Sequence, residues 1–202
     1  RTDFDTIRKN IELEARLIDD LLDLTRLSRG KVKLERAIVD VHAALQSAIT
    51  TVRGEIEQKQ IALTVNLNAK RTSVQGDDTR LQQVFWNVLK NAVKFTDSGG
   101  NIFVHTETLG DSLFVAKISD TGIGIDPNET EHIFDAFAQG AHSGFGGLGL
   151  GLAISRKLID QHEGKVLASS ECKGRGATFT LELPLAQSSP SQRNKPGAMA
   201  GN

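Results

Sequence analysis

The sequence contains one cysteine, Cys172, so it cannot form an internal disulfide, which suits a reducing compartment. Its formal net charge of -1 provides no long-range attraction toward nucleic acid or an anionic membrane. It has no apolar run long enough to span a bilayer and no recognisable secretory signal. These absences predict a cytoplasmic chain that does not bind nucleic acid. Its length of 202 residues is enough to form a proper core.

Because the sequence begins at Arg1 rather than at a methionine, we expect a piece of a longer protein. An anchor in the inner membrane, if the parent protein has one, would lie in the missing part. From residue 187 onward the composition has no capacity for a core, so we expect a flexible tail or linker over 187–202.

Three familiar nucleotide-binding signatures are incomplete or absent. Glycine is concentrated between Asp120 and Leu152, where backbone amides that approach a ligand closely would bind a phosphate. Gly144, Gly146 and Gly149 form the string G-x-G-x-x-G, but residues 138–143 before it are not strand-like, as a Rossmann site requires. The V-A-I-K, H-R-D and D-F-G motifs of protein kinases are missing, and so is a Walker A motif. The glycines alone therefore indicate either another nucleotide site or a mobile loop.

Hydrophobic periodicity predicts alternating helices and strands. The predicted helices cover 3–28, 42–58, 77–95, 128–138 and 148–162, and the predicted strands cover 32–41, 61–67, 101–108, 112–119, 166–170 and 177–185. The first helix carries a wide apolar stripe, so it either pairs with another helix or subunit or is an ordinary helix of the domain.

Polar residues interrupt the otherwise apolar helix predicted over 77–95. Asn87, Asn91 and Lys94 fall on one face of it, where they are either solvated or bind a ligand. Asparagine lowers helix propensity, which favours a compensating role. Asp120 follows a predicted strand beside Gly122, where it either caps the turn or accepts a hydrogen bond from a ligand amine.

Four motifs follow one another along the chain: N-x-x-x-N-A-x-K-F at 87–95, D-x-G-x-G at 120–124, F-D-A-F at 134–137 and G-L-G-L-G-L at 147–152. In this order they resemble the N box, first glycine box, F box and second glycine box of the ATP-binding catalytic domain of sensor histidine kinases in two-component systems. The resemblance covers about 32–185. It implies an α/β two-layer sandwich, with a mixed, mostly antiparallel sheet packed on helices and one long preceding helix, as in the Bergerat-type fold of histidine kinases, gyrase and chaperone ATPases. The implied domains are half of a dimerisation hairpin over 1–30, an ATP-binding domain over 31–186 and the tail.

The resemblance also implies roles for individual residues, with ATP and Mg²⁺ as the cofactors. Asp120 would read the adenine amino group with Gly124 allowing close approach, Asn91 would ligate Mg²⁺, and Lys94 would contact phosphate. Asn87 beside the metal and Gln139 near the terminal phosphate would be catalytic, and residues 138–146 would form a lid. The remaining implied contacts are Phe95, Gly122, Ile125, Ile133, Phe137, Gly147, Leu148, Gly149, Leu150, Gly151 and Thr178, the last replacing a contact that Ala177 cannot make.

The implied reaction is transfer of the γ-phosphoryl group of Mg-ATP to a histidine. None of the five histidines of this chain lies in the family's His-acid-Pro context, so we expect the acceptor on a separate dimerisation helix of the parent. The implied partners are that helix and a response-regulator receiver domain, with a homodimeric parent and a monomeric fragment. The rivals are an ATPase or serine kinase of the same fold, and a non-catalytic interaction module.

Overall fold

The computed structural model describes residues 11, 18, 21–27, 33–138 and 148–187. Its main sheet has five strands in the order β2 (Ala62–Leu67), β4 (Asn101–Leu109), β5 (Leu113–Asp120), β7 (Thr178–Pro184) and β6 (Lys165–Ser169). The β2–β4 pair is parallel and the other pairs are antiparallel. A small antiparallel sheet pairs β1 (Ala37–Asp40) with β3 (Ser73–Gly76). The predicted mixed, mostly antiparallel sheet is therefore confirmed.

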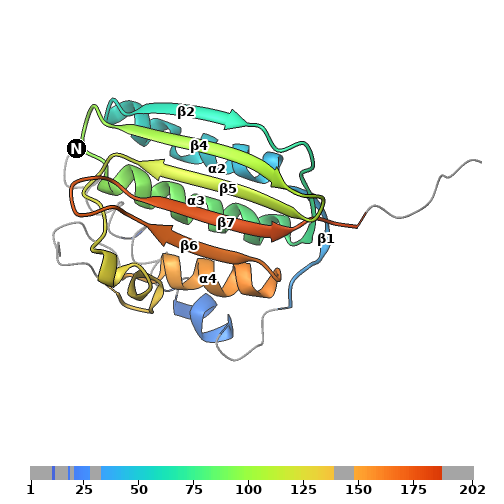
Figure 1. Cartoon of the computed structure of the whole chain (residues 1–202). Coiled ribbons are helices and arrows are strands. Elements are labelled where there is room, and N and C mark those ends of the chain that lie inside the picture. The colour runs from blue at the N-terminus through green and yellow to red at the C-terminus, as the bar shows by residue number, and fades with distance from the viewer. Residues whose placement is uncertain (1–10, 12–17, 19–20, 28–32, 139–147, 188–202) are drawn as a thin grey trace, which may run out of the picture.

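Three helices cover one face of the main sheet and complete a two-layer sandwich (Figure 1). They are α2 (Val41–Gln58), α3 (Asp78–Phe95) and α4 (Gly151–Gln161), and two short 3-10 helices, η1 (Pro127–Glu129) and η2 (His132–Phe134), precede α4. None of the helices in the described ranges is long and apolar enough to cross a membrane.

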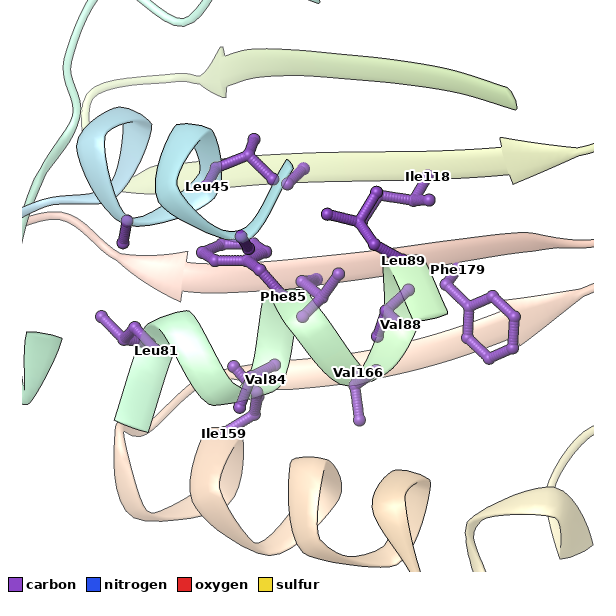
Figure 2. Packing of buried hydrophobic residues seen from close by; sticks show 14 of the residues in the cluster. Leu45, Leu81, Val84, Phe85, Val88, Leu89, Ile118, Ile159, Val166 and Phe179 are labelled. Atoms are coloured by element: carbon purple, nitrogen blue, oxygen red, sulfur yellow. The ribbon is translucent and has the colours of Figure 1, made fainter. Parts of the chain in front are cut away.

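The core is centred on α3. Figure 2 shows this helix between α2 and α4, with Phe85 on the side of Leu45 in α2 and Val84 near Ile159 in α4. All four side chains are fully buried. Successive residues of a strand point to opposite faces, and in β5 this alternation places Phe114, Ala116 and Ile118 against the helices. Burial of this apolar surface holds the ends of the strands and the ends of the helices in fixed relative positions.

Side-chain carboxylates begin both long helices. Asp40 accepts a hydrogen bond from the His42 amide at 3.0 Å at the start of α2, and Asp77 accepts one from the Arg80 amide at 3.2 Å at the start of α3. Such caps satisfy amides that have no partner within the helix. Asp77 is therefore the N-cap of α3.

Several predicted boundaries are wrong. The strand predicted over 32–41 contains only Ala37–Asp40, and β3 was not predicted because its four residues carry no clear alternation. The helix predicted over 148–162 begins at Gly151, since Gly149 adopts a φ of +70° that a right-handed helix excludes.

The helix predicted over 128–138 is absent. Its place is taken by η1 and η2, whose hydrogen bonds join residues three apart, as from the Phe134 amide to the Glu131 carbonyl. Phe137 has a φ of +66°, so the backbone cannot continue as a helix there.

Residues 21–27 are helical and contact the rest of the described chain. Leu24 and Leu27 are buried in the core cluster. The carboxylate of Asp23 accepts hydrogen bonds from Arg80 at 2.7 Å and Gln83 at 3.1 Å, near the start of α3. Most of the helix predicted over 3–28, the tail from 188 and residues 139–146 of the predicted lid lie outside the described residues.

His162 joins the end of α4 to the start of α3. Its Nε2 accepts a hydrogen bond from the Asp77 amide at 3.0 Å, and its Nδ1 donates one to the Leu158 carbonyl at 2.7 Å. The side chain is only 3% exposed, and this burial lowers its pKa from the usual 6.5. Protonation would also remove the acceptor for the Asp77 amide.

Because the folded pKa of His162 is lowered, the unfolded chain binds more protons once the pH falls below about 6.5. The stability that neutral His162 provides is therefore complete above that pH and is lost as the pH falls, by up to about 1.4 kcal/mol per pH unit. We expect His162→Gln, which keeps an acceptor but does not titrate, to show a smaller loss of stability between about pH 7.5 and about pH 5.5. Urea unfolding at both pH values measures this, and equal losses in the two proteins would contradict it.

Candidate functional site

The last three turns of α3 carry the predicted polar face. Asn87 is 7% exposed, and its Nδ2 donates hydrogen bonds to the Gly151 carbonyl at 3.0 Å and to the Ser155 hydroxyl at 3.2 Å. Asn87 therefore fastens α3 to the first turn of α4. A Cβ on Gly151 would lie 3.4 Å from this amide, so the two helices are already in close contact.

Asn91 and Lys94 lie one and two turns further along α3, and both are half-buried. The side chain of Asn91 makes no hydrogen bond to any described residue, which leaves its amide oxygen available for a ligand. The Lys94 ammonium lies 4.7 Å from the centre of the Phe95 ring, and burial lowers the pKa of this lysine. An anion bound beside Lys94 would favour its charged form.

Asp120 is the last residue of β5 and its side chain is buried. One carboxylate oxygen, Oδ1, accepts hydrogen bonds from the amides of Gly122 at 2.9 Å and Ala177 at 3.3 Å. Within the described chain the other oxygen, Oδ2, accepts none. Burial raises the pKa of Asp120, while the two amide hydrogen bonds oppose that rise. The carboxylate is thus oriented by one oxygen and has the other available to a buried donor.

The backbone around Asp120 leaves no room for side chains. A Cβ on Gly122 would lie 2.2 Å from the Phe95 carbonyl oxygen, and one on Gly176 would lie 1.9 Å from the Asp120 carbonyl oxygen. Gly124 has a φ of +67° and would clash with the Cys172 carbonyl. These glycines are required because three backbone segments meet here at contact distance.

The loop over residues 170–176 holds this glycine-containing turn from the other side. The Gly174 amide donates to the Ile123 carbonyl at 2.6 Å, and the Gly176 amide donates to the Gly122 carbonyl at 3.0 Å. The Ser170 hydroxyl accepts from the Ile125 amide at 3.1 Å. Sequence reasoning missed Ser170, because no motif marks it and its partner lies 45 positions away.

The F-D-A-F segment packs beside the second glycine box. Phe134 is buried and meets Phe179 edge-on, with ring centres 6.3 Å apart, while Arg156 of α4 lies 5.5 Å from its ring. The Phe137 amide donates to the Gly149 carbonyl at 3.2 Å, but the Phe137 side chain is 57% exposed. The remaining apolar residues predicted for the site are buried or partly buried against the core; they are Ile125, Ile133, Leu148 and Leu150.

The structure places the Thr178 side chain away from Asp120. Thr178 points to the sheet face opposite the helices, where its hydroxyl lies 2.8 Å from that of Ser119. Asp120 points to the helical face, and the residue that reaches it is Ala177, through its backbone amide. Thr178 therefore does not replace the side-chain contact that Ala177 lacks. Gln139 and Gly147 lie outside the described residues.

A protein-family model described as histidine kinase-, DNA gyrase B-, and HSP90-like ATPase matches residues 76–187, more than half of the chain. This chain belongs to that family. The matched range contains all four motifs and every segment of the site described above. The fold is thereby confirmed, and the similarity to histidine kinases such as RcsC and ShkA confirms the identification as a histidine-kinase ATP-binding domain.

Curated relatives and solved structures agree with this assignment. The sensor histidine kinase RcsC of Salmonella typhimurium is 36% identical over 174 residues, which are 84% of this chain and 18% of RcsC. Full-length ShkA, solved in complex with AMPPNP, is 28% identical with a TM-score of 0.82, and the match covers 96% of this chain and 40% of ShkA. The histidine kinase ThkA, solved with the response regulator TrrA, has a TM-score of 0.72 over 92% of this chain and 51% of that chain; at 21% identity it supports the fold alone.

The chain is short beside its relatives, of which it spans 14% to 23% in the first three curated matches. The homologues are histidine kinases, and proteins of that kind partner with response regulators, as ThkA does with TrrA.

The site of this histidine-kinase domain fits an adenine nucleotide. Asp120 Oδ2 is a buried acceptor for an amino group, and the surrounding glycines let a flat ring approach the backbone. A magnesium ion fits through its ligand chemistry, since it prefers oxygen ligands and keeps phosphates and water among them. In the described part of the chain no three His, Cys, Asp or Glu side chains converge, so the protein would supply few of those oxygens, the Asn91 amide oxygen among them.

The close contact between Gly122 and α3 leads to a prediction about stability. Gly122→Ala is expected to lower the free energy of unfolding by about 1 to 3 kcal/mol, because its new methyl group would overlap the Phe95 carbonyl. Gly54→Ala is the matched control, since nothing lies within 4 Å of its Cβ and a helical alanine should add about 0.5 to 1 kcal/mol. Urea unfolding measures both, and equal stabilities of the two variants would contradict the prediction.

Proposed function

We propose that this domain binds Mg-ATP and transfers the γ-phosphoryl group to a histidine on a dimerisation helix. The observation that carries the proposal is the convergence of three segments far apart in sequence. Phe95 at the end of α3 accepts from the Ile123 amide at 3.2 Å, and Asn87 donates to Gly151 at the start of α4. This convergence supports a single connected site for the adenine, metal and phosphate contacts that the four motifs imply.

In this proposal each segment has one task. Asp120 accepts a hydrogen bond from the adenine amino group, and its buried position makes that bond stronger than in water. Lys94 neutralises phosphate charge. The amides of the first turn of α4 face the phosphates at the positive end of the helix dipole. Asn87 keeps that turn at a fixed distance from α3.

Magnesium, held by Asn91 together with the phosphates, would neutralise charge that develops on the transferring group. Phosphoryl transfer requires little covalent chemistry from the protein, so the remaining contribution of this domain is positioning. Asn91 is suited to this role because its amide has no competing hydrogen bond among the described residues.

The acceptor is proposed to lie on a helical hairpin, of which residues 1–30 would form the second helix. The contact of Asp23 with Arg80 and Gln83 supports this, because it attaches the end of that helix to the ATP-binding domain. His162 is a poor acceptor because both of its ring nitrogens are engaged and buried. A receiver domain of a response regulator would then take the phosphoryl group from the hairpin, and the parent would be a homodimer.

Two substitutions separate the adenine contact from the metal contact. Asp120→Asn should weaken binding of ATP with or without magnesium, because losing one hydrogen bond to a charged group costs about 1.5 to 3 kcal/mol. Asn91→Ala should weaken binding only when magnesium is present. Isothermal titration calorimetry of each variant with ATP, with and without Mg²⁺, gives the four affinities. If both variants bound ATP as the unsubstituted chain does, the proposed roles would be wrong.

The proposed location of the acceptor can be tested with γ-labelled ATP. We expect no label on the 202-residue chain alone and acid-labile label on a separately supplied dimerisation hairpin, because none of the five histidines has the acceptor context. Acid-labile label on the chain alone would show that one of them is an acceptor. His142→Ala and His162→Ala would then identify which.

A further inference from the structure

Lys59 reaches from the end of α2 to the end of α3. Its ammonium donates three hydrogen bonds, to the carbonyl oxygens of Val93 at 2.8 Å, Lys94 at 3.0 Å and Thr96 at 2.9 Å. A lysine has three donors, so all of them are used. The backbone carbonyl of Lys59 also accepts from the Gly99 amide at 3.0 Å, which attaches the turn after α3 to the same residue.

The other carbonyls at this helix end have different partners. Ala92 accepts from the amide and the hydroxyl of Thr96, at 3.1 and 2.7 Å, and Phe95 accepts from the Ile123 amide at 3.2 Å. The last carbonyls of a helix have no partner within it and carry partial negative charge. Lys59 therefore satisfies and neutralises those that neither Thr96 nor the turn after Asp120 reaches.

We propose that Lys59 is a positioning residue for the phosphate side of the nucleotide site. Val93 and Lys94, whose carbonyls it holds, lie in the same turn as the side chain of Lys94, and Asn91 precedes them by less than one turn. Without the ammonium, this turn would hold unpaired, half-buried carbonyls and would loosen. This inference rests on the proposed function, in which Asn91 and Lys94 contact the metal and the phosphates.

The adenine side has a separate support. The turn after Asp120 meets the end of α3 through the Phe95 carbonyl, but it is also held by Ser170, Gly174 and Gly176, none of which contacts Lys59. Loss of the Lys59 ammonium should therefore act on the phosphates and the metal more than on the adenine. That asymmetry distinguishes a positioning role from general support of the fold.

The test is calorimetric titration of the full chain and of Lys59→Met with Mg-ATP and, separately, with adenosine. We expect Lys59→Met to bind Mg-ATP about tenfold more weakly, which corresponds to one hydrogen bond to a charged group, and to bind adenosine as the unsubstituted chain does. Hydrogen exchange supplies a second readout, in which the Thr96 amide should exchange faster in the variant. Lys59→Arg, which keeps charge and donors, should recover most of the affinity for Mg-ATP.

Lys90→Met is the matched control, because Lys90 also joins α3 to α2, through Glu55, but holds no helix-end carbonyl. Equal affinities of Lys59→Met and Lys90→Met for Mg-ATP would overturn the inference, and so would an equal loss of adenosine and Mg-ATP binding in Lys59→Met. If Lys59→Met does not fold, Lys59→Gln, which keeps two amide donors, replaces it in the same comparison. Failure of the unsubstituted chain to bind Mg-ATP would overturn the proposed function and this inference with it.

Discussion

A helix of 18 residues ends with carbonyl groups that no residue of the helix can satisfy, and in α3 these carbonyls determine how the site is assembled. Lys59 holds two of them from the side of α2, while Phe95 receives the Ile123 amide from the turn after Asp120. A buried carbonyl without a hydrogen bond costs free energy. The bonds to these carbonyls therefore hold both Lys59 and the turn after Asp120 in position against α3. The absence of a side chain at Gly122 is part of this arrangement, since a methyl group there would push the turn away from α3.

Burial shifts the pKa values of the acidic and the basic group of the site in opposite directions. Burial raises the pKa of Asp120 and lowers that of Lys94, because it makes the charged form of each group less favourable. A ligand with a donor at one end and negative charge at the other relieves both, and a nucleotide has this polarity. Burying a carboxylate with one of its oxygens unpaired costs free energy, and a loop that served only as a turn would not require it.

The sequence predicted the long periodic elements better than their boundaries. The positions of α2 and α3 follow from local patterns, and the four motifs predict a common site for Asn87, Asn91 and Asp120. The helix predicted over 128–138 failed because burial of Phe134 against Phe179 outweighed a weak local period. Thr178 could have been placed correctly, since alternation with Phe179 and Leu181 puts it on the outer face. Lys59 could not, because its partners lie 34 to 37 positions away and no motif marks them.

The late start of α4, at Gly151, leaves backbone amides available for phosphate. Had the helix begun at residue 148 as the periodicity predicts, the amides at 152 and 153 would have been used by carbonyls one turn earlier. Instead Gly149 turns the chain with a positive φ, and the carbonyl of the N-cap residue Leu150 accepts its hydrogen bond from the Ile154 amide. The amides of the preceding residues are thereby left at the positive end of the helix dipole. Asn87 holds this end of α4 against α3. The side chain for which the sequence favoured a ligand-binding role therefore also sets the distance between these two helices.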